Sequence, residues 1–124
     1  MARLVVDGMN VIGSRPDGWW RDRPAAMRRL AASLAERAAE GEEEVTVVFD
    51  GREPEPPVEA AGVEVRFAPG GPNAADRAIE ALVAASDDPA AITVITSDRD
   101  LERRVGDLGA SVRPAARFRA ELDG

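Results

Sequence analysis

The chain has 124 residues, of which 44% are hydrophobic, and its formal net charge is −7; this length predicts a single domain over residues 1–124 with one core. It contains no Cys, His or Tyr, and all sixteen of its basic residues are Arg. The inventory excludes disulfides, thiolate or imidazole zinc sites, serine–histidine and cysteine–histidine pairs and lysine Schiff bases, so an enzyme built from it would depend on carboxylates together with a hard metal ion.

The charge and hydropathy patterns set expectations about location and partners. No apolar run approaches the length of a membrane-spanning helix and no signal peptide precedes the first strand, so we expect a cytoplasmic protein without membrane contact. The acidic charge argues weakly against a general nucleic-acid binder, because phosphate contacts dominate such affinity. Residues 1–30, however, hold six Arg against three acids, whereas residues 36–64 hold two Arg against ten acids. One side can therefore be basic although the chain is acidic.

The first predicted strand is the apolar run at residues 4–6, which leads into Asp7, Gly8 and then Asn10. An acid at the end of a buried strand lies at the rim of a sheet rather than on its face. Residues 11–22 are rich in Gly, Pro and Asp, which predicts a loop that overhangs this strand end.

A helix is predicted over about 24–40, beginning after Asp22 or Arg23, with Pro24 at its first position. Gly41 would end it. Its apolar residues recur at three- and four-residue spacing, as in an amphipathic helix: Met27, Leu30, Ala31, Leu34 and Ala38.

A second apolar strand is predicted over residues 45–50 and ends, like the first, in an Asp-Gly pair formed by Asp50 and Gly51. Residues 52–61 are rich in Pro and Glu and predict a surface linker. Residues 63–68 alternate apolar and charged side chains, as expected of a strand at or near a sheet edge.

The next helix is predicted over about 74–86, with Asn73 as its N-cap. Asp76 lies in its first turn, and Glu80 follows one turn later on a neighbouring face.

The most β-prone run of the chain covers residues 91–96 and is followed at once by Ser97 and Asp98. A helix is then predicted over about 99–108, ended by Gly109. A short strand at 111–113 and a short basic helix at 116–122 complete the chain.

Strands alternate with helices almost throughout, which predicts an α/β fold with a mainly parallel sheet flanked by helices. In such sheets ligands bind outside the carboxyl ends of the strands. Asp7, Asp50 and Asp98 lie at such ends, and Asp76 should lie near the same rim. Four neighbouring carboxylates would repel one another unless a cation neutralised them, and Mg²⁺ or Mn²⁺ prefer such oxygen ligands. The residues therefore indicate metal-assisted phosphodiester hydrolysis.

Each acid also has a structural explanation, since Asp is common in turns and in the first turn of a helix. For Asp76 the two explanations are evenly matched, and for Glu80 the structural one is preferred. The pairing of Asp7 with Asn10, and of Ser97 with Asp98 directly after a strand, favours function.

Together these motifs resemble the NYN domain family, in particular its bacterial YacP-like branch, which has a PIN-like nuclease fold. The matching stretches occur in the right order at residues 5–13, 48–51, 73–80, 96–98 and 109–122. The resemblance implies a three-layer, Rossmann-like fold with a five-stranded sheet of order 3-2-1-4-5. It also implies a pocket for Mg²⁺ or Mn²⁺ and endoribonuclease activity, in some relatives on ribosome-associated messenger RNA.

The resemblance assigns roles to individual residues. The acidic metal site would consist of Asp7, Asp76 and Asp98. Asn10 and Ser97 would orient substrate or metal-bound water. Asp50 would support the site, and Glu80 would be a further candidate ligand because it matches the acid of the family's Asp-x-x-x-Glu helix pattern.

RNA contacts are predicted around the loop at 11–22 and near the C-terminus. Arg grips phosphates bidentately, and the candidates are Arg15, Arg21, Arg113 and Arg117. Trp19 and Trp20 would stack on unpaired bases; the alternative for one of them is that it covers the first helix.

We therefore predict a divalent-metal-dependent endoribonuclease that hydrolyses single-stranded RNA with a metal-activated water. One alternative is a non-catalytic module of the same fold that binds RNA, a ribosome or a protein, which would explain the acidity. A second is a metal-dependent phosphatase for small nucleotides, which would share the pocket but would need no basic track.

Overall fold

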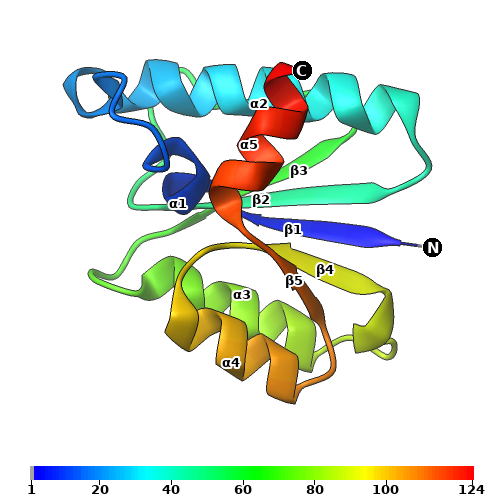
Figure 1. The fold of residues 1–124 in the computed structure, drawn as a ribbon. Coiled ribbons are helices and arrows are strands. Elements are labelled where there is room, and N and C mark those ends of the chain that lie inside the picture. The colour runs from blue at the N-terminus through cyan, green and yellow to red at the C-terminus, as the bar shows by residue number, and fades with distance from the viewer. Residues whose placement is uncertain (1) are drawn as a thin grey trace.

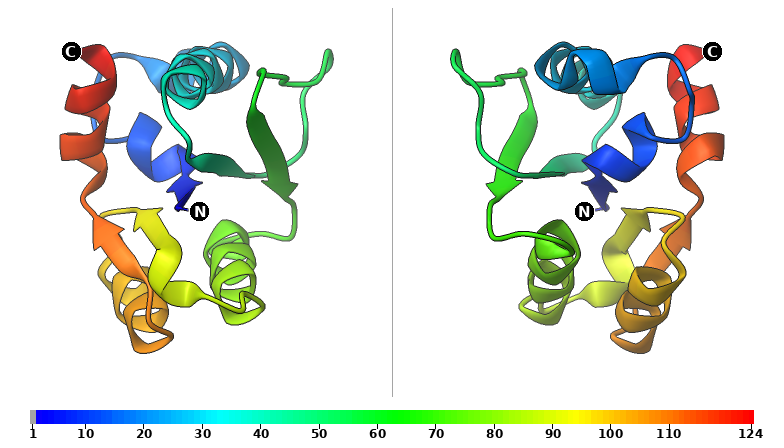
Figure 2. Two further views of the ribbon diagram at one scale, coloured as in Figure 1. Left: turned by 90° about the vertical axis from the view of Figure 1, so that its right-hand side faces the viewer. Right: turned by 90° about the vertical axis from the view of Figure 1, so that its left-hand side faces the viewer.

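The computed structural model describes residues 2–124 and shows a central sheet between two layers of helices (Figures 1 and 2). The strands are β1 (Arg3–Asp7), β2 (Glu44–Asp50), β3 (Val63–Ala68), β4 (Ile92–Ile95) and β5 (Ser111–Arg113). The α-helices are α1 (Gly8–Ile12), α2 (Arg23–Glu40), α3 (Ala74–Ala84), α4 (Arg99–Asp107) and α5 (Ala115–Asp123). Two 3₁₀ helices, η1 (Trp19–Arg21) and η2 (Pro89–Ala91), lie in connections.

The five strands form one sheet in the order β3-β2-β1-β4-β5, and every neighbouring pair is parallel. The predicted order 3-2-1-4-5 is therefore confirmed, including the parallel pairing of β2 with β3. The chain starts with the central strand β1, continues with β2 and β3 on one side of it, and then crosses to β4 and β5 on the other side. The order thus reverses between β1 and β4, and ligand sites of open α/β sheets lie at the carboxyl end of such a point.

Each face of the sheet has its own apolar core. Leu4 and Val6 of β1 pack with residues of α1, α2 and α5 on one face. Val5, between them in sequence, points to the opposite face and packs with residues of α3 and α4. This alternation is the two-residue period of a strand covered on both sides, and it explains why β1 is apolar without interruption.

The predicted elements agree with the structure within a few residues, and α2 begins as expected. The Asp22 side chain accepts a hydrogen bond from the Ala25 backbone N–H at 3.1 Å, and Pro24 lies in the first turn. The prediction of a loop over 11–22 was partly wrong, because Val11 and Ile12 belong to α1 and residues 19–21 form η1. A helix of five residues is too short to show a recognisable period.

Gly8 begins α1 at a point where the backbone passes directly over the ring of Phe49. A Cβ atom at Gly8 would lie 2.5 Å from Cε1 of Phe49 and 3.0 Å from the Val48 carbonyl oxygen. Only glycine therefore fits where the first strand turns into its helix.

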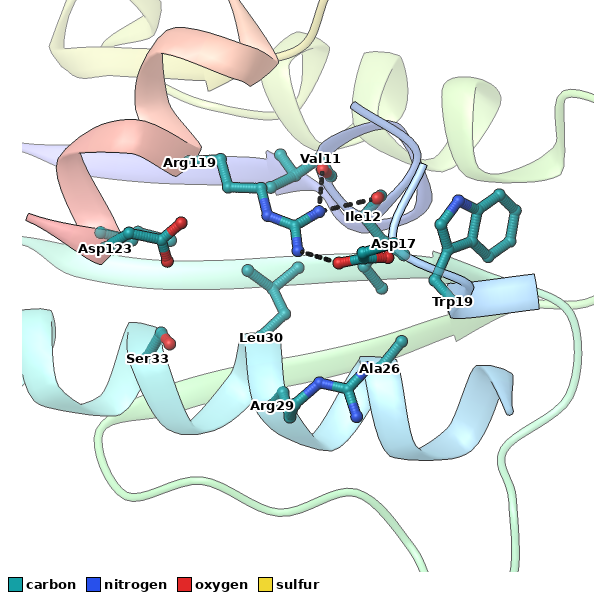
Figure 3. Close-up of a pocket in the computed structure, with 11 residues that line it drawn as sticks. Val11, Ile12, Asp17, Trp19, Ala26, Arg29, Leu30, Ser33, Arg119 and Asp123 are labelled. Carbon is teal, nitrogen blue, oxygen red and sulfur yellow. Dashed lines mark hydrogen bonds and ion pairs between the residues drawn. The ribbon is translucent and has the colours of Figure 1, made fainter. Parts of the chain in front are cut away.

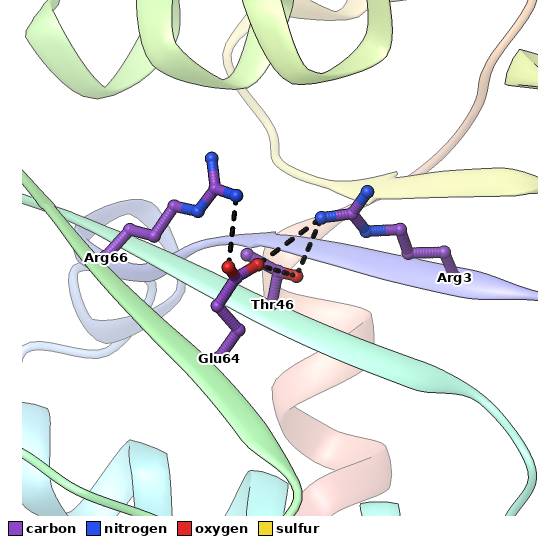
Figure 4. Close-up of polar contacts among 4 residues, drawn as sticks. All are labelled: Arg3, Thr46, Glu64 and Arg66. Atoms are coloured by element: carbon purple, nitrogen blue, oxygen red, sulfur yellow. Dashed lines mark hydrogen bonds and ion pairs between the residues drawn. The ribbon is translucent and has the colours of Figure 1, made fainter. Parts of the chain in front are cut away.

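Polar side chains join β1, β2 and β3 across one face of the sheet, and the linker after β2 packs against the core. Thr46 is buried on β2; its hydroxyl donates to Glu64 and accepts from Arg3, and Arg66 pairs with Glu64 as well (Figure 4). The linker predicted at 52–61 has no regular structure, but Val58 is buried in the core that contains α2. Among residues 2–124, no helix combines the length and the apolar character that a membrane crossing requires.

Candidate functional site

Four carboxylates converge on one pocket at the carboxyl edge of the sheet, where the strand order reverses. The pocket has a volume of about 250 Å³, and its lining includes Asp7, Asp50, Asp76 and Asp98. Asp7 ends β1 and Asp50 ends β2, whereas Asp98 is the N-cap of α4 and Asp76 lies in the first turn of α3. The structure thus brings together the four acids that the strand ends predicted. We call this the acidic pocket.

Hydrogen bonds fix one oxygen of three of these carboxylates. The Thr96 hydroxyl donates to Asp7 Oδ2 at 2.8 Å. The backbone N–H groups of Ala75 and Leu101 donate to Oδ1 of Asp50 and of Asp98, at 3.1 Å and 3.0 Å. These bonds orient the carboxylates and leave the second oxygen of each available to a ligand.

The electrostatics of the pocket are those of crowded, poorly solvated acids. Burial raises the pKa of Asp7 from 3.8 to about 7, and the negative charges of Asp76, Asp50 and Asp98 act in the same direction, against the hydrogen bond from Thr96. Burial also raises the pKa of Asp76, with further contributions from Asp98 and Asp50, while Arg104 opposes the shift. A bound cation would relieve this repulsion.

Asn10 and Ser97, predicted to orient substrate or water, contact each other beside the acids. Asn10 Oδ1 accepts from the Ser97 backbone N–H at 2.8 Å. Ser97 Oγ accepts from the Ala115 backbone N–H at 2.9 Å, at the start of α5. Asn10 lines the acidic pocket, and the two contacts tie α1 and α5 to the segment between β4 and α4.

Asn73 differs from the sequence-based expectation, whereas Glu80 lies as its structural explanation would have it. Asn73 has a left-handed backbone with a φ of 65° and makes no capping bond through its side chain; Asp50 caps the helix instead. Glu80 lies outside the lining of the acidic pocket and forms an ion pair with Arg104 at 3.7 Å. A cap contributed from another strand cannot be recognised from local sequence.

The donor set of the acidic pocket fits Mg²⁺ or Mn²⁺, which bind carboxylate oxygens and water. The fit rests on four convergent carboxylates, and the pKa values of Asp7 and Asp76 are raised first by burial and then by the charge of neighbouring acids. Within residues 2–124, however, no three carboxylates stand close enough together to form a closed metal-binding cluster. The pocket therefore supplies suitable donor atoms without a preformed cluster of three ligands.

Two further hollows adjoin the acidic pocket. An apolar groove of about 400 Å³ shares Met9, Asp50 and Asn73 with it, and its other lining residues are Trp19, Arg23, Gly51, Gly71 and Pro72. A second hollow of about 260 Å³ shares Asn73, Asp76 and Asp98 and adds the basic residues Arg77 and Arg104. The acidic pocket is thus flanked by an apolar hollow and by a charged one, whose lining holds Asp76, Asp98 and Asp100 as well as the two Arg.

The residues predicted to contact RNA occupy different environments. Trp19 packs partly against the core, whereas Trp20 is 52% exposed and meets Trp19 edge to face at 5.9 Å. The Arg21 guanidinium lies 6.0 Å from the centre of the Trp20 ring. Two of the arginine candidates form ion pairs within the protein: Arg15 pairs with Asp123, and Arg113 pairs with Glu121.

Arg117 is exposed on α5, whereas Arg119 is central to how α5 is attached. Its guanidinium donates to the carbonyl oxygens of Val11 and Ile12, at 3.3 Å and 2.8 Å, and pairs with Asp17 at 2.7 Å (Figure 3). It thereby satisfies the end of α1, beside a cavity of about 170 Å³ that also reaches Trp19.

Thr96 and Arg104 are contributors that the sequence did not reveal. Thr96 joins two of the acids, because its hydroxyl donates to Asp7 and accepts from the Asp98 backbone N–H at 3.1 Å. It directly follows β4, beside the end of β1. Arg104 gave no signal, because a charged residue on a short helix is usually a solvated one.

A parallel α/β sheet with acids gathered at the reversal of its strand order defines a PIN-like domain. A YacP-like NYN domain model matches residues 4–124, and the chain belongs to that family. Two solved structures are similar to it. One is a tryptophan-to-leucine variant of Rae1 (YacP) from Bacillus subtilis, with 31% identity, a TM-score of 0.81, and coverage of 99% of this chain and 76% of that one. The other is Rae1 (YacP) itself, with 29% identity, a TM-score of 0.78, and coverage of 99% and 74%. Among curated proteins no match was found.

Proposed function

We propose that this protein is a divalent-metal-dependent endoribonuclease that cuts single-stranded RNA at the acidic pocket. NYN and PIN-like domains are typically nucleases, so the family supports a hydrolase acting on nucleic acid. The observation that carries the proposal is the convergence of Asp7, Asp50, Asp76 and Asp98 on one pocket, with the pKa of Asp7 raised to about 7. A protein gains nothing in stability from gathering uncompensated acids, so the arrangement favours a bound cation.

The chain's residues would divide the work as follows. Asp7, Asp76 and Asp98 would hold the ion, with Thr96 and the Leu101 N–H keeping two of them oriented. A bound Mg²⁺ or Mn²⁺ would lower the pKa of a water and neutralise charge on the phosphodiester. Asn10 would hold the phosphate or the water by its amide, since its oxygen is already engaged by Ser97.

Arginine and apolar side chains beside the pocket support RNA as the substrate. Arg77 and Arg104 lie in the hollow on one side, and Trp19 and Arg23 line the groove on the other. Arg and aromatic side chains that flank a cutting site are the usual means of gripping a single strand. A phosphatase for small nucleotides would need neither hollow.

The test is cleavage of a single-stranded RNA in Mn²⁺, in Mg²⁺ and in EDTA by the wild type and by two variants. Asp76→Asn removes a charge from the pocket without removing any hydrogen bond that the side chain makes to the fold, so the variant should fold normally. It should lower metal-dependent cleavage about 100-fold or more. Asp107→Asn, an exposed position at the end of α4, is the matched control and should cut as the wild type does.

The other outcomes separate the alternatives. RNA bound by all three proteins and cut by none, in either metal, would replace the nuclease by a non-catalytic RNA-binding module. Turnover of a small phosphate ester without cleavage of RNA would identify a phosphatase. Equal cleavage by the wild type and Asp76→Asn would place the reaction elsewhere.

A further inference from the structure

The apolar groove beside the acidic pocket has features of a binding site for a flat ring. Arg23 and Asp50 are the charged residues of its lining, and its other walls come from Met9, Trp19 and the segment Gly71–Pro72. The Arg23 guanidinium lies 5.8 Å from the centre of the Trp19 ring. An indole with a cation nearby offers both stacking and charge to a planar ligand.

One wall of the groove is bare backbone. Gly51 and Gly71 have φ angles of 96° and 90°, and a Cβ atom at either would meet nothing within 4 Å. These positions therefore face open space. Their left-handed conformation favours glycine, so this wall of the groove carries no side chain at either position. The turn after β2 and the turn before α3 leave the groove open where it joins the acids.

We propose that this groove binds one unpaired nucleobase of the RNA strand, next to the phosphodiester placed at the acidic pocket. The inference rests on the proposed function and adds a base-binding subsite to it. The groove and the acidic pocket share Met9, Asp50 and Asn73, so a nucleotide can span both. The apolar lining suits the ring, and Arg23 complements the adjoining phosphate.

The subsite gives the enzyme a physical reason to require single strands. A base in a duplex is stacked and paired, and turning it into the groove would cost a few kcal/mol. For an unpaired base this free-energy cost is much smaller. Selection of single-stranded RNA would thus come from the groove rather than from the metal site.

The first arm of the test is photo-crosslinking in EDTA, where no metal-dependent cleavage occurs. A single-stranded oligonucleotide that carries 5-iodouridine is irradiated with the wild-type protein, and the adducts are located by tandem mass spectrometry. The proposal predicts adducts on Trp19 or Met9. Adducts confined to the exposed Trp20, or to residues outside the groove, would overturn it.

The second arm measures affinity at low salt in EDTA for two oligonucleotides of equal length and charge, one intact and one built from abasic spacers. The wild type should prefer the intact strand about tenfold, the effect of one good stacking contact. Trp19→Ala should lose most of that preference. If Trp19→Ala does not fold, Met9→Ala is the second variant, and it should reduce the preference as well. Leu108→Ala, at an exposed apolar position directly after α4 and outside the groove lining, should keep it.

These outcomes separate the subsite from the proposed function because neither arm depends on catalysis. Equal affinity of the wild type for both strands, or no measurable affinity for either, would overturn the base-binding subsite even if RNA is cut. A preserved preference that depends on Trp19, in a protein that never cuts RNA, would keep the subsite and reject the nuclease.

Discussion

At the residue scale, Asp7 is a buried carboxylate whose position costs stability when it is ionised. It is 4% exposed, it accepts one hydrogen bond from Thr96, and three other acids surround it. A structural capping role would place such a side chain against backbone N–H groups, as it does for Asp50 and Asp98. Asp7 has no such bond from the backbone, so its position is best explained by a ligand that the pocket is built to receive.

Replacement of this acid should therefore stabilise the protein, in a pH-dependent way. Because the folded-state pKa of Asp7 is raised from 3.8 to about 7, the folded protein holds this proton more tightly than the unfolded chain. The stability that the bound proton contributes to the folded protein is therefore fully present below about pH 4, and it is lost as the pH rises to about 7. Asp7→Asn keeps an acceptor for Thr96 and has no proton to lose. Its free energy of unfolding should exceed that of the wild type by about 1–3 kcal/mol at pH 8 and by little at pH 4.5.

Urea denaturation without metal at the two pH values measures this difference. Asp107→Asn serves as the exposed control and should change stability by less than about 0.5 kcal/mol at either pH. An Asp7→Asn variant that is less stable than the wild type at pH 8 would mean that the buried carboxylate is compensated within the fold, and the argument for a cation would lose its main support.

At the element scale, the strand-to-helix turns set the geometry of the pocket. Local patterns predicted β1, β2, β4, α2 and α4 well, because long apolar runs and an Asp-Pro helix start are strong signals. The same patterns missed α1, which has five residues, and misassigned the cap of α3 to Asn73. Both errors arise from contacts across the chain, since α1 is packed in a core built by α2 and α5 and α3 is capped by the end of β2.

The close approach at the start of α1 gives a prediction with an internal control. Gly8→Ala would force a Cβ into the Phe49 ring and should lower the free energy of unfolding by about 1–3 kcal/mol, the usual effect of overpacking. Gly106→Ala lies in α4, where a Cβ meets nothing within 4 Å, and should raise stability by about 0.5–1 kcal/mol. Denaturant titrations of both variants measure the opposite signs; a stabilised Gly8→Ala would contradict the close packing of α1 on β2.

At the scale of the whole molecule, the site follows from topology. Parallel strands all deliver their carboxyl ends to one edge, so acids at residues 7, 50 and 98 had to meet once the order 3-2-1-4-5 was in place. That much was predictable from the sequence and the family resemblance together. Long-range side-chain contacts could not be predicted, because they leave no local pattern in the sequence. They include the hydrogen bonds of Thr96, the ion pair of Arg104 and the attachment of α5 by Arg119.

The distribution of charge belongs to the same scale. The chain is acidic overall, yet Arg77 and Arg104 stand beside the acidic pocket and Arg23 stands in the groove on its other side. Individual arginines can therefore contact phosphates close to the pocket although acids surround it, and their contribution should weaken as salt screens it.

The most direct measurement of the central claim uses a covalently closed circle of single-stranded RNA, which has no ends for an exonuclease and no terminal phosphate for a phosphatase. Incubation with the wild-type protein and Mn²⁺ should convert the circle into a linear strand, and EDTA or the Asp76→Asn substitution should prevent the conversion. A circle that stays intact with folded wild-type protein in both Mn²⁺ and Mg²⁺, or that is opened equally by Asp76→Asn, would contradict the account.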